Sequence, residues 1–236
     1  MKILSIDSTA QTSTCAITED GRILACASVR SELNHTETLL PLIDECLSSC
    51  NITLDDVGAF ALSNGPGSFA GVRIGVSLVK GLAFGRGKVC VALSTLEALA
   101  YNLFPLDGIY CPVMDARRGQ VYNALFRRSG EAIERLCPDR AVSLEDLSNE
   151  LQKYDCDIYL CGDGYSVAAE RLSLPRIKQT PILLRDQSAA SVGLLAGIKL
   201  GTGEGVCTDK ELKASYLRLP QAERERLEKL KDTKEN

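Results

Sequence analysis

The feature that most constrains the fold is an order of strand and helix patterns that occurs twice along the chain. The first occurrence opens with three short apolar strands and continues with alternating helices and strands. A second series begins at Ile109 in the same order. The expected strands are 2–7, 13–18, 23–29, 59–63, 88–93, 109–115, 120–127, 131–136 and 157–161, and the expected helices are 35–50, 70–84, 188–200 and those starting at 95 and 143. This duplication predicts an α/β fold with two lobes of about 105 residues facing each other across a cleft.

Local signals mark several helix starts. Asn34 with Glu37, and Ser94 with Glu97, each have the spacing of a capping box. Pro41 lacks the amide that a helix interior needs, so the helix at 35–50 is expected either to start near Pro41 or to bend there.

The composition is that of an ordinary globular protein. The 236 residues are 45% hydrophobic and 25% charged, and Met1 and Lys2 lead directly into a strand pattern without a signal-peptide pattern before it. No apolar run approaches the roughly 18 residues of a membrane span. We therefore expect a cytoplasmic protein that has no membrane segment.

The charge pattern argues against nucleic-acid binding by the chain alone. The net charge is −4, and 27 basic residues are interspersed with 31 acidic ones. No basic run is present that could neutralise a row of phosphates.

Metal and hydrolase sites also lack their usual residues. The ten cysteines lie mostly among apolar residues, and no Cys-x-x-Cys pair occurs. His35 is the only histidine, so a catalytic Ser-His-Asp triad would have to use it. A lone histidine that opens a helix is more often a capping or surface residue. We expect no bound metal and no cofactor.

Asp7, Ser8 and Thr9 follow the first strand directly. A carboxylate there can hold a hydrated magnesium ion while hydroxyls and amides approach a phosphate, but such a triplet also caps ordinary turns. Both interpretations, a vestigial phosphate loop and a structural turn, stay open. Gly162, Asp163 and Gly164 are expected to form a tight turn.

A glycine-rich stretch, 63–83, contains a helix with two apolar faces. Gly71 and Gly75 lie one turn apart between these faces and allow another backbone to approach closely. The pattern alone gives equal support to two interpretations, packing of this helix inside the lobe and contact with a helix of another molecule. The faces consist of Val72, Val76, Val79 and Ala83 on one side and of Ile74, Leu78 and Leu82 on the other.

Several segments together resemble the TsaB family, also called YeaZ. These segments are 6–9, 39–43, 63–83, 114–122 and 215–218. The resemblance implies two duplicated actin-like lobes, of the class shared by Hsp70 and sugar kinases with an RNase H-like core. It also implies work in the bacterial cytosol with TsaD and the ATPase TsaE. That system forms N6-threonylcarbamoyladenosine (t6A) at position 37 of tRNAs that read codons beginning with adenine.

Comparison with the paralogue TsaD predicts that this chain is not catalytic. TsaD has a His-x-x-x-His metal motif, and the matching positions here are Thr95 and Leu99. Neither side chain can replace an imidazole ligand. The resemblance therefore implies a scaffold without catalytic residues, which belongs to the transferase complex but has no expected activity alone.

The same resemblance places the TsaD interface on the helix at 35–50 and on the glycine-rich helix. The expected interface residues are Leu39, Leu40, Ile43, Gly71, Val72, Gly75, Val76 and Val79. Transfer RNA is expected to bind only through the complex. The expected domains are an N-terminal lobe, 1–107, a C-terminal lobe, 108–218, and a charged tail, 219–236.

Two alternatives stay open. A free-standing ATP-dependent kinase or hydrolase of the actin-like superfamily would use Asp7 and a second-lobe carboxylate such as Asp115. A homodimer through the same two helices is the third hypothesis, because a surface suited to a paralogue can also accept a second copy.

Overall fold

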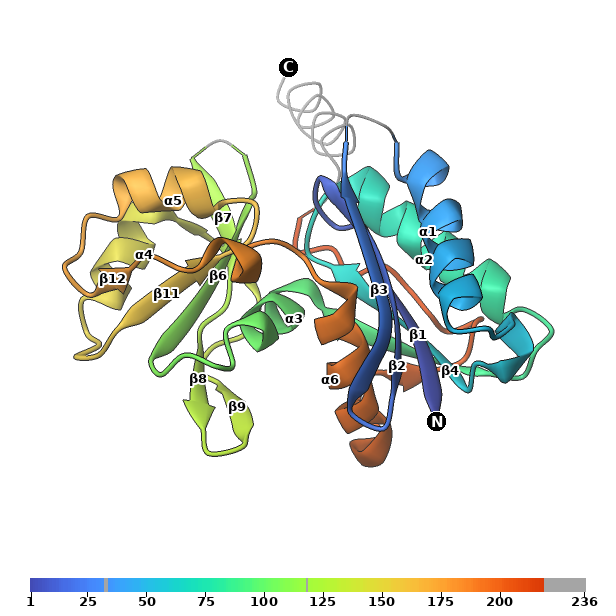
Figure 1. Ribbon diagram of the computed structural model, residues 1–236. Coiled ribbons are helices and arrows are strands. Elements are labelled where there is room, and N and C mark those ends of the chain that lie inside the picture. The colour runs from blue at the N-terminus through green and yellow to red at the C-terminus, as the bar shows by residue number, and fades with distance from the viewer. Residues whose placement is uncertain (32–33, 118, 219–236) are drawn as a thin grey trace, which may run out of the picture.

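The computed structural model describes residues 1–31, 34–117 and 119–218. Two β-sheets stand side by side, and each has helices packed against it (Figure 1). This confirms the predicted α/β class. The predicted charged tail, 219–236, and Arg118 lie outside the described residues.

The N-terminal sheet has the strand order β13-β5-β4-β1-β2-β3. The three predicted first strands form an antiparallel meander, and β4 and β5 join β1 in parallel. The loops that follow β1, β4 and β5 therefore meet at one edge of the sheet. The strands are β1 (Lys2–Asp7), β2 (Thr12–Glu19), β3 (Arg22–Arg30), β4 (Ala59–Gly65), β5 (Val89–Ser94) and β13 (Val206–Cys207).

Different helices cover the two faces of this sheet (Figure 1). Because side chains alternate along a strand, Leu4 and Ile6 of β1 pack toward α1 and α2, whereas Ile3 packs toward α6. The short helix α3 lies beside α6 and also contacts β6 of the second sheet. The bounds are α1 (His35–Ser49), η1 (Leu54–Asp56), α2 (Phe69–Ala83), α3 (Thr95–Asn102) and α6 (Ala189–Thr202).

Helix α1 begins at the predicted capping box and not at Pro41. The Asn34 amide donates a 3.0 Å hydrogen bond to Glu37 Oε2, and the helix runs through Pro41 to Ser49. The Ser94 hydroxyl likewise accepts from the Glu97 amide at the start of α3. Side chains that satisfy the first amides therefore determine these helix starts.

The second sheet has the main strand order β10-β7-β6-β11-β12, with β8 and β9 as a hairpin beside β6. The predicted single strand at 120–127 is two strands, β7 and β8. Both pair with β6, and the break lies opposite Pro112, which cannot donate to the ladder. The bounds are β6 (Ile109–Asp115), β7 (Gln120–Asn123), β8 (Phe126–Ser129), β9 (Ala132–Arg135), β10 (Arg140–Ser143), α4 (Leu144–Leu151), β11 (Ile158–Cys161), α5 (Tyr165–Arg171), β12 (Ile177–Lys178) and η2 (Ile182–Leu184).

The chain returns to the N-terminal sheet after η2, which corrects the expected C-terminal lobe of 108–218. Val192, Leu195 and Ala196 of α6 pack on β1, β4 and β5, and β13 pairs with β5. Gly193 lets α6 approach, since a β-carbon there would lie 2.8 Å from Ser5 Oγ. Residues of the expected second lobe are therefore divided between the two sheets, while the boundary at 107/108 stays a prediction. No helix in the described ranges is both long enough and apolar enough to cross a membrane.

Candidate functional site: helices α1 and α2 and the turn after β1

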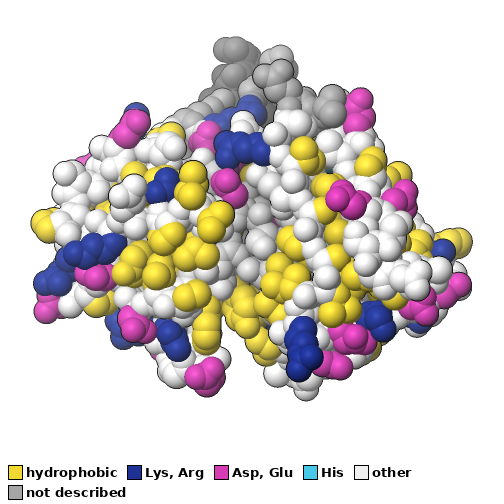
Figure 2. Space-filling view, in the orientation of Figure 1, with side chains coloured by type: hydrophobic (Ala, Val, Ile, Leu, Met, Phe, Trp, Pro, Cys, Tyr) yellow, Lys and Arg dark blue, Asp and Glu magenta, His cyan; other side chains and the backbone are white. Residues whose placement is uncertain are grey.

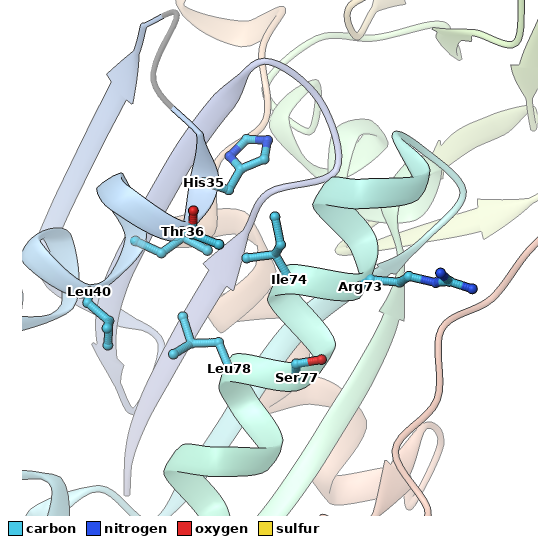
Figure 3. Close-up of a pocket in the computed structure, with 8 residues that line it drawn as sticks. His35, Thr36, Leu40, Arg73, Ile74, Ser77 and Leu78 are labelled. Atoms are coloured by element: carbon cyan, nitrogen blue, oxygen red, sulfur yellow. The ribbon is translucent and has the colours of Figure 1, made fainter.

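An apolar groove lies between α1 and α2, with a volume of about 510 Å³. Leu40 approaches it from α1, and Ile74 and Leu78 turn toward α1 from α2 (Figure 3). Leu40 is 48% exposed, and Ile74 and Leu78 are half-buried. We call the surface formed by Leu40, Ile74 and Leu78 the helix groove. Its exposed apolar side chains make it the candidate functional surface.

Most of the residues expected at the partner interface lie beneath this surface. Leu39 and Ile43 of α1 and Val72, Val76 and Val79 of α2 are buried in one core cluster on β1, β2 and β4. Only Leu40 of the expected set is exposed. The expectation that the other side chains form a surface is therefore corrected, because each helix uses its more apolar face against the chain's own sheet.

The two glycines of α2 face inward as well. A β-carbon at Gly75 would lie 2.7 Å from Ser8 Oγ, and one at Gly71 would collide with the Ser8 carbonyl oxygen. The absent side chains thus allow α2 to approach the turn after β1, not a second molecule. The expected placement of Gly71 and Gly75 at the partner interface is corrected for this reason.

The Asp7 turn is tightly hydrogen-bonded within the chain. Asp7 is 1% exposed, and its Oδ1 accepts from the Thr9 amide at 2.8 Å and from the Thr9 hydroxyl at 2.7 Å. Burial raises the pKa of the Asp7 carboxyl, against the opposing effect of these hydrogen bonds. The Ser8 hydroxyl donates to the Gly71 carbonyl oxygen at 2.9 Å. Since these donors are engaged inside the chain, the geometry favours the structural interpretation of the turn over a phosphate loop.

His35 begins α1 beside this turn. Its Nδ1 lies 2.6 Å from the Ser13 hydroxyl, which also contacts the Thr38 hydroxyl at 2.7 Å. Ser13 is 2% exposed, so a substrate has no access to it in this arrangement. The pair therefore joins α1 to β2 as a structural contact. The sequence singled out His35 but gave no signal for Ser13.

The positions aligned with the TsaD histidines lie on α3, between the two sheets. Thr95 is fully buried, and its hydroxyl has no hydrogen-bond partner among the described residues. Leu99 packs with Tyr110 and Met114 of β6. Nowhere in the described ranges do three His, Cys, Asp or Glu side chains gather where a metal ion could bind.

Asp115, the second-lobe carboxylate of the ATP-dependent alternative, and the segment 162–164 both lie at turns. Asp115 Oδ1 accepts a 2.7 Å hydrogen bond from the Arg117 amide. Gly162 has a φ of 97°, and its carbonyl oxygen accepts from the Tyr165 amide at 3.0 Å. This confirms the turn predicted at 162–164. No hydrogen bond or ion pair among the described residues joins Asp115 to Asp7.

Comparison with known proteins gives consistent matches. Residues 29–223 match the family described as "TsaD: tRNA N6-adenosine threonylcarbamoyltransferase". The tRNA threonylcarbamoyladenosine biosynthesis protein TsaB of Bacillus subtilis (strain 168) is 34% identical over 167 residues, which cover 71% of this chain and 73% of that protein. The protein of the same name from Escherichia coli (strain K12) is 30% identical over 189 residues and 79% of each chain.

Structural comparison agrees with these matches. A Pseudomonas aeruginosa crystal structure, described as an uncharacterized protein with similarity to peptidase YEAZ, superimposes with a TM-score of 0.81 and 25% identity. The superposition covers 92% of this chain and 99% of that one. This likeness confirms the predicted actin-like fold class.

Proposed function

Because the chain belongs to the TsaB (YeaZ) branch of the family that TsaD represents, we propose that it is the non-catalytic partner of TsaD in t6A formation. In this role it holds TsaD in its active arrangement, and TsaE joins the assembly. The modified nucleoside is at position 37 of tRNAs that read codons beginning with adenine. The relatives from B. subtilis and E. coli are named for threonylcarbamoyladenosine biosynthesis, which supports the pathway.

The helix groove is the observation that carries the partner role. An exposed apolar groove between two helices suits the apolar face of another helix or helix pair. Leu40, Ile74 and Leu78 keep their apolar surface in contact with water in the isolated chain, and a partner that covers them would remove that contact. We place TsaD in this groove, so that α1 and α2 remain the interface and present Leu40, which was expected, together with Ile74 and Leu78, which were not.

The residues at the positions of the TsaD metal motif and at the Asp7 turn support a scaffold. Thr95 and Leu99 offer no imidazole, and the Asp7 turn engages its own hydroxyls and amide. The chemistry of threonylcarbamoyl transfer then belongs to TsaD, and this chain acts through binding.

The distribution of charge on this chain supports binding of tRNA through TsaD and not by the chain alone. On the face shown in Figure 2, basic and acidic side chains are interspersed and do not form one extended basic patch. With a net charge of −4, the isolated chain would repel the tRNA backbone overall. TsaD would supply most of the phosphate contacts.

The test mixes the purified chain with TsaD of the same organism and measures complex formation by gel filtration and calorimetry. Wild type should bind, and Leu40→Glu and Leu78→Glu should each weaken binding by at least about 10-fold, because a carboxylate would be buried in an apolar contact. Ile198→Glu is the matched control, since Ile198 is 54% exposed on α6 at the opposite face of the sheet. It should bind as wild type does.

A reconstituted t6A reaction completes the test. Leaving out the chain, or using Leu78→Glu, should lower the t6A content of digested tRNA. If both proteins are folded and no complex forms, the proposed partner role is wrong. A homodimer of the isolated chain that the same two substitutions abolish would show that the groove also accepts a second copy.

A further inference from the structure

Arg73 of α2 is among the residues that line the groove, and its side chain extends away from Leu40 and Leu78 (Figure 3). Its guanidinium carbon lies 3.8 Å from the centroid of the Phe69 ring, and its Nε donates a 3.1 Å hydrogen bond to the Tyr216 hydroxyl. The Phe69 and Tyr216 rings contact each other, with centroids 4.9 Å apart. Two aromatic side chains therefore hold the guanidinium in one place.

Tyr216 belongs to a segment, residues 213–218, which we call the C-terminal strap. The Asn64 side-chain amide donates to the Lys213 carbonyl oxygen at 2.9 Å, and the Ser215 amide donates to the Asn64 carbonyl oxygen at 2.7 Å. At the end of the strap, Arg218 donates to the Ala116 carbonyl oxygen of the second sheet at 2.9 Å. The position of Tyr216 is thus fixed by contacts to both halves of the molecule.

Arg73 is held without a carboxylate among the described residues. No Asp or Glu oxygen of residues 1–31, 34–117 and 119–218 lies within 4.0 Å of its nitrogens. Arg30, Arg135 and Arg140, in contrast, each form an ion pair. Arg73 is exposed, and only its Nε has a hydrogen-bond partner in the described structure. Its two terminal amino groups have no hydrogen-bond partner within residues 1–31, 34–117 and 119–218, and they form a pair of available donors there.

We propose that Arg73 is an acid-recognising residue of the partner surface, that a carboxylate of the docked protein forms a bidentate pair with it, and that Tyr216 is its positioning residue. The proposal rests on the proposed docking of TsaD at the helix groove. The planar guanidinium matches a carboxylate through two parallel hydrogen bonds. Ordering Arg73 in advance lowers the entropy that binding would otherwise lose.

Affinity and orientation then come from different side chains of the same surface. The apolar side chains of the groove supply most of the affinity, and the Arg73 guanidinium at its border determines how the partner is oriented. A partner that fits the groove but lacks the carboxylate would leave Arg73 without its anion and would bind less tightly. The C-terminal strap thereby becomes part of the recognition surface although it lies outside both helices.

The experiment measures TsaD affinity by calorimetry at low and high salt for Arg73→Glu, Arg73→Lys, Tyr216→Phe and Arg22→Glu. We expect Arg73→Glu to weaken binding by at least about 30-fold and to reduce its salt dependence, and Arg73→Lys to weaken binding by about 5-fold because the charge remains without the fork. Arg22→Glu, the matched charge reversal on the exposed edge strand β3, should bind as wild type does.

Tyr216→Phe tests positioning, because it removes only the hydroxyl that accepts from Arg73. It should weaken binding about 3-fold in the wild-type background and not at all in the Arg73→Ala background. Equal losses in both backgrounds would show that Tyr216 acts independently of Arg73 and would overturn the positioning role. Melting temperatures within about 2 °C of wild type are expected for every variant, since the cluster is at the surface.

Three outcomes overturn the acid-recognition role. If wild type binds TsaD and Arg73→Glu binds it with the same affinity, the acid-recognition role is wrong and the proposed function stays in place. If wild type does not bind TsaD, the acid-recognition role and the proposed function are both wrong. The sequence 219–236 contains Glu223, Glu225 and Glu228, and changing them to Gln in the full chain is the third comparison. If this triple substitution abolishes the effect of Arg73→Glu, the carboxylate belongs to the chain itself.

Discussion

The Ser8 side chain occupies the space above Gly75, so a β-carbon at Gly75 would lie 2.7 Å from Ser8 Oγ. The same hydroxyl donates to the Gly71 carbonyl oxygen, one turn earlier in α2. The turn after β1 and the first half of α2 are therefore fitted to each other. The glycine spacing in this helix serves the interior of the chain.

We predict that Gly75→Leu destabilises the isolated protein by about 3 kcal/mol or more, because the new side chain has no space beside Ser8 and the core. Gly81→Ala on the same helix should instead stabilise it by about 0.5–1 kcal/mol, since nothing lies within 4 Å of a β-carbon there and alanine is the better helix former. Urea unfolding measures both changes. A Gly75→Leu protein as stable as wild type would place Gly75 at the surface and contradict the fold at this point.

A second prediction concerns the buried Asp7 carboxyl, whose pKa is raised by burial. A carboxyl with a raised pKa in the folded state favours folding when protonated and loses that contribution as the pH rises through its folded pKa. Asp7→Asn keeps an oxygen for the two Thr9 donors and carries no charge. The variant should therefore be more stable than wild type at pH 7, and the difference should shrink as the pH falls toward about 4, the ordinary Asp value.

Melting curves between pH 4 and pH 8 measure this difference. The proposed scaffold role adds that Asp7→Asn leaves t6A formation within about 2-fold of wild type, whereas loss of a magnesium-holding carboxylate would cost about 100-fold or more. A loss of that size with the fold intact would favour the ATP-dependent alternative.

Local patterns predicted much of the fold. The pairs Asn34 with Glu37 and Ser94 with Glu97 marked helix starts that the structure confirms, because a capping side chain acts within one turn. The break between β7 and β8 depends on Pro112, which the sequence shows but which acts on a partner strand. The return of α6 to the first sheet is a long-range contact, and no local pattern specifies it.

The candidate site was harder to predict for a related reason. Helix α2 is apolar on the side of Val72 and Val76 and also on the side of Ile74 and Leu78, so the sequence could identify two apolar faces but not which one meets the sheet. The contact between Arg73 and Tyr216 joins residues 143 positions apart and leaves no periodic signal. Only the structure could assign these faces and bring these residues together.

A third prediction tests the ionic contacts between the two sheets. Lys199 of α6 is 7% exposed and lies 3.0 Å from Glu97 Oε1, while Arg135 of β9 lies 3.2 Å from Glu97 Oε2. Glu97→Gln would leave both cations with one carboxylate fewer and should lower the free energy of unfolding by about 1–3 kcal/mol. Asp55→Asn is the control, because the Asp55 side chain is 89% exposed and its contact with Arg86 should contribute less than about 0.5 kcal/mol. Equal effects of the two substitutions would show that the Glu97 contacts are as weak as a surface pair.

The last prediction tests the return of the chain to the N-terminal sheet through Cys90 and Cys207. These residues are directly opposite in the antiparallel pair of β5 and β13, and all ten cysteines are free thiols. Opposite residues in such a pair have α-carbons about 4.5–5.5 Å apart, within the range of about 4.4–6.8 Å that disulfides span. Diamide, which takes one hydrogen from each thiol and becomes a hydrazine, should therefore link Cys90 to Cys207.

Peptide mapping without reductant should find this link between Cys90 and Cys207 in wild type and not in Cys207→Ser. Because a link at this position holds β13 and the C-terminal strap on the sheet, the oxidised protein should also melt at a higher temperature than its reduced form, by an amount that Cys207→Ser abolishes. A map in which Cys207 pairs only with cysteines of the second sheet would contradict the pairing of β13 with β5 and the return of the chain to the N-terminal sheet.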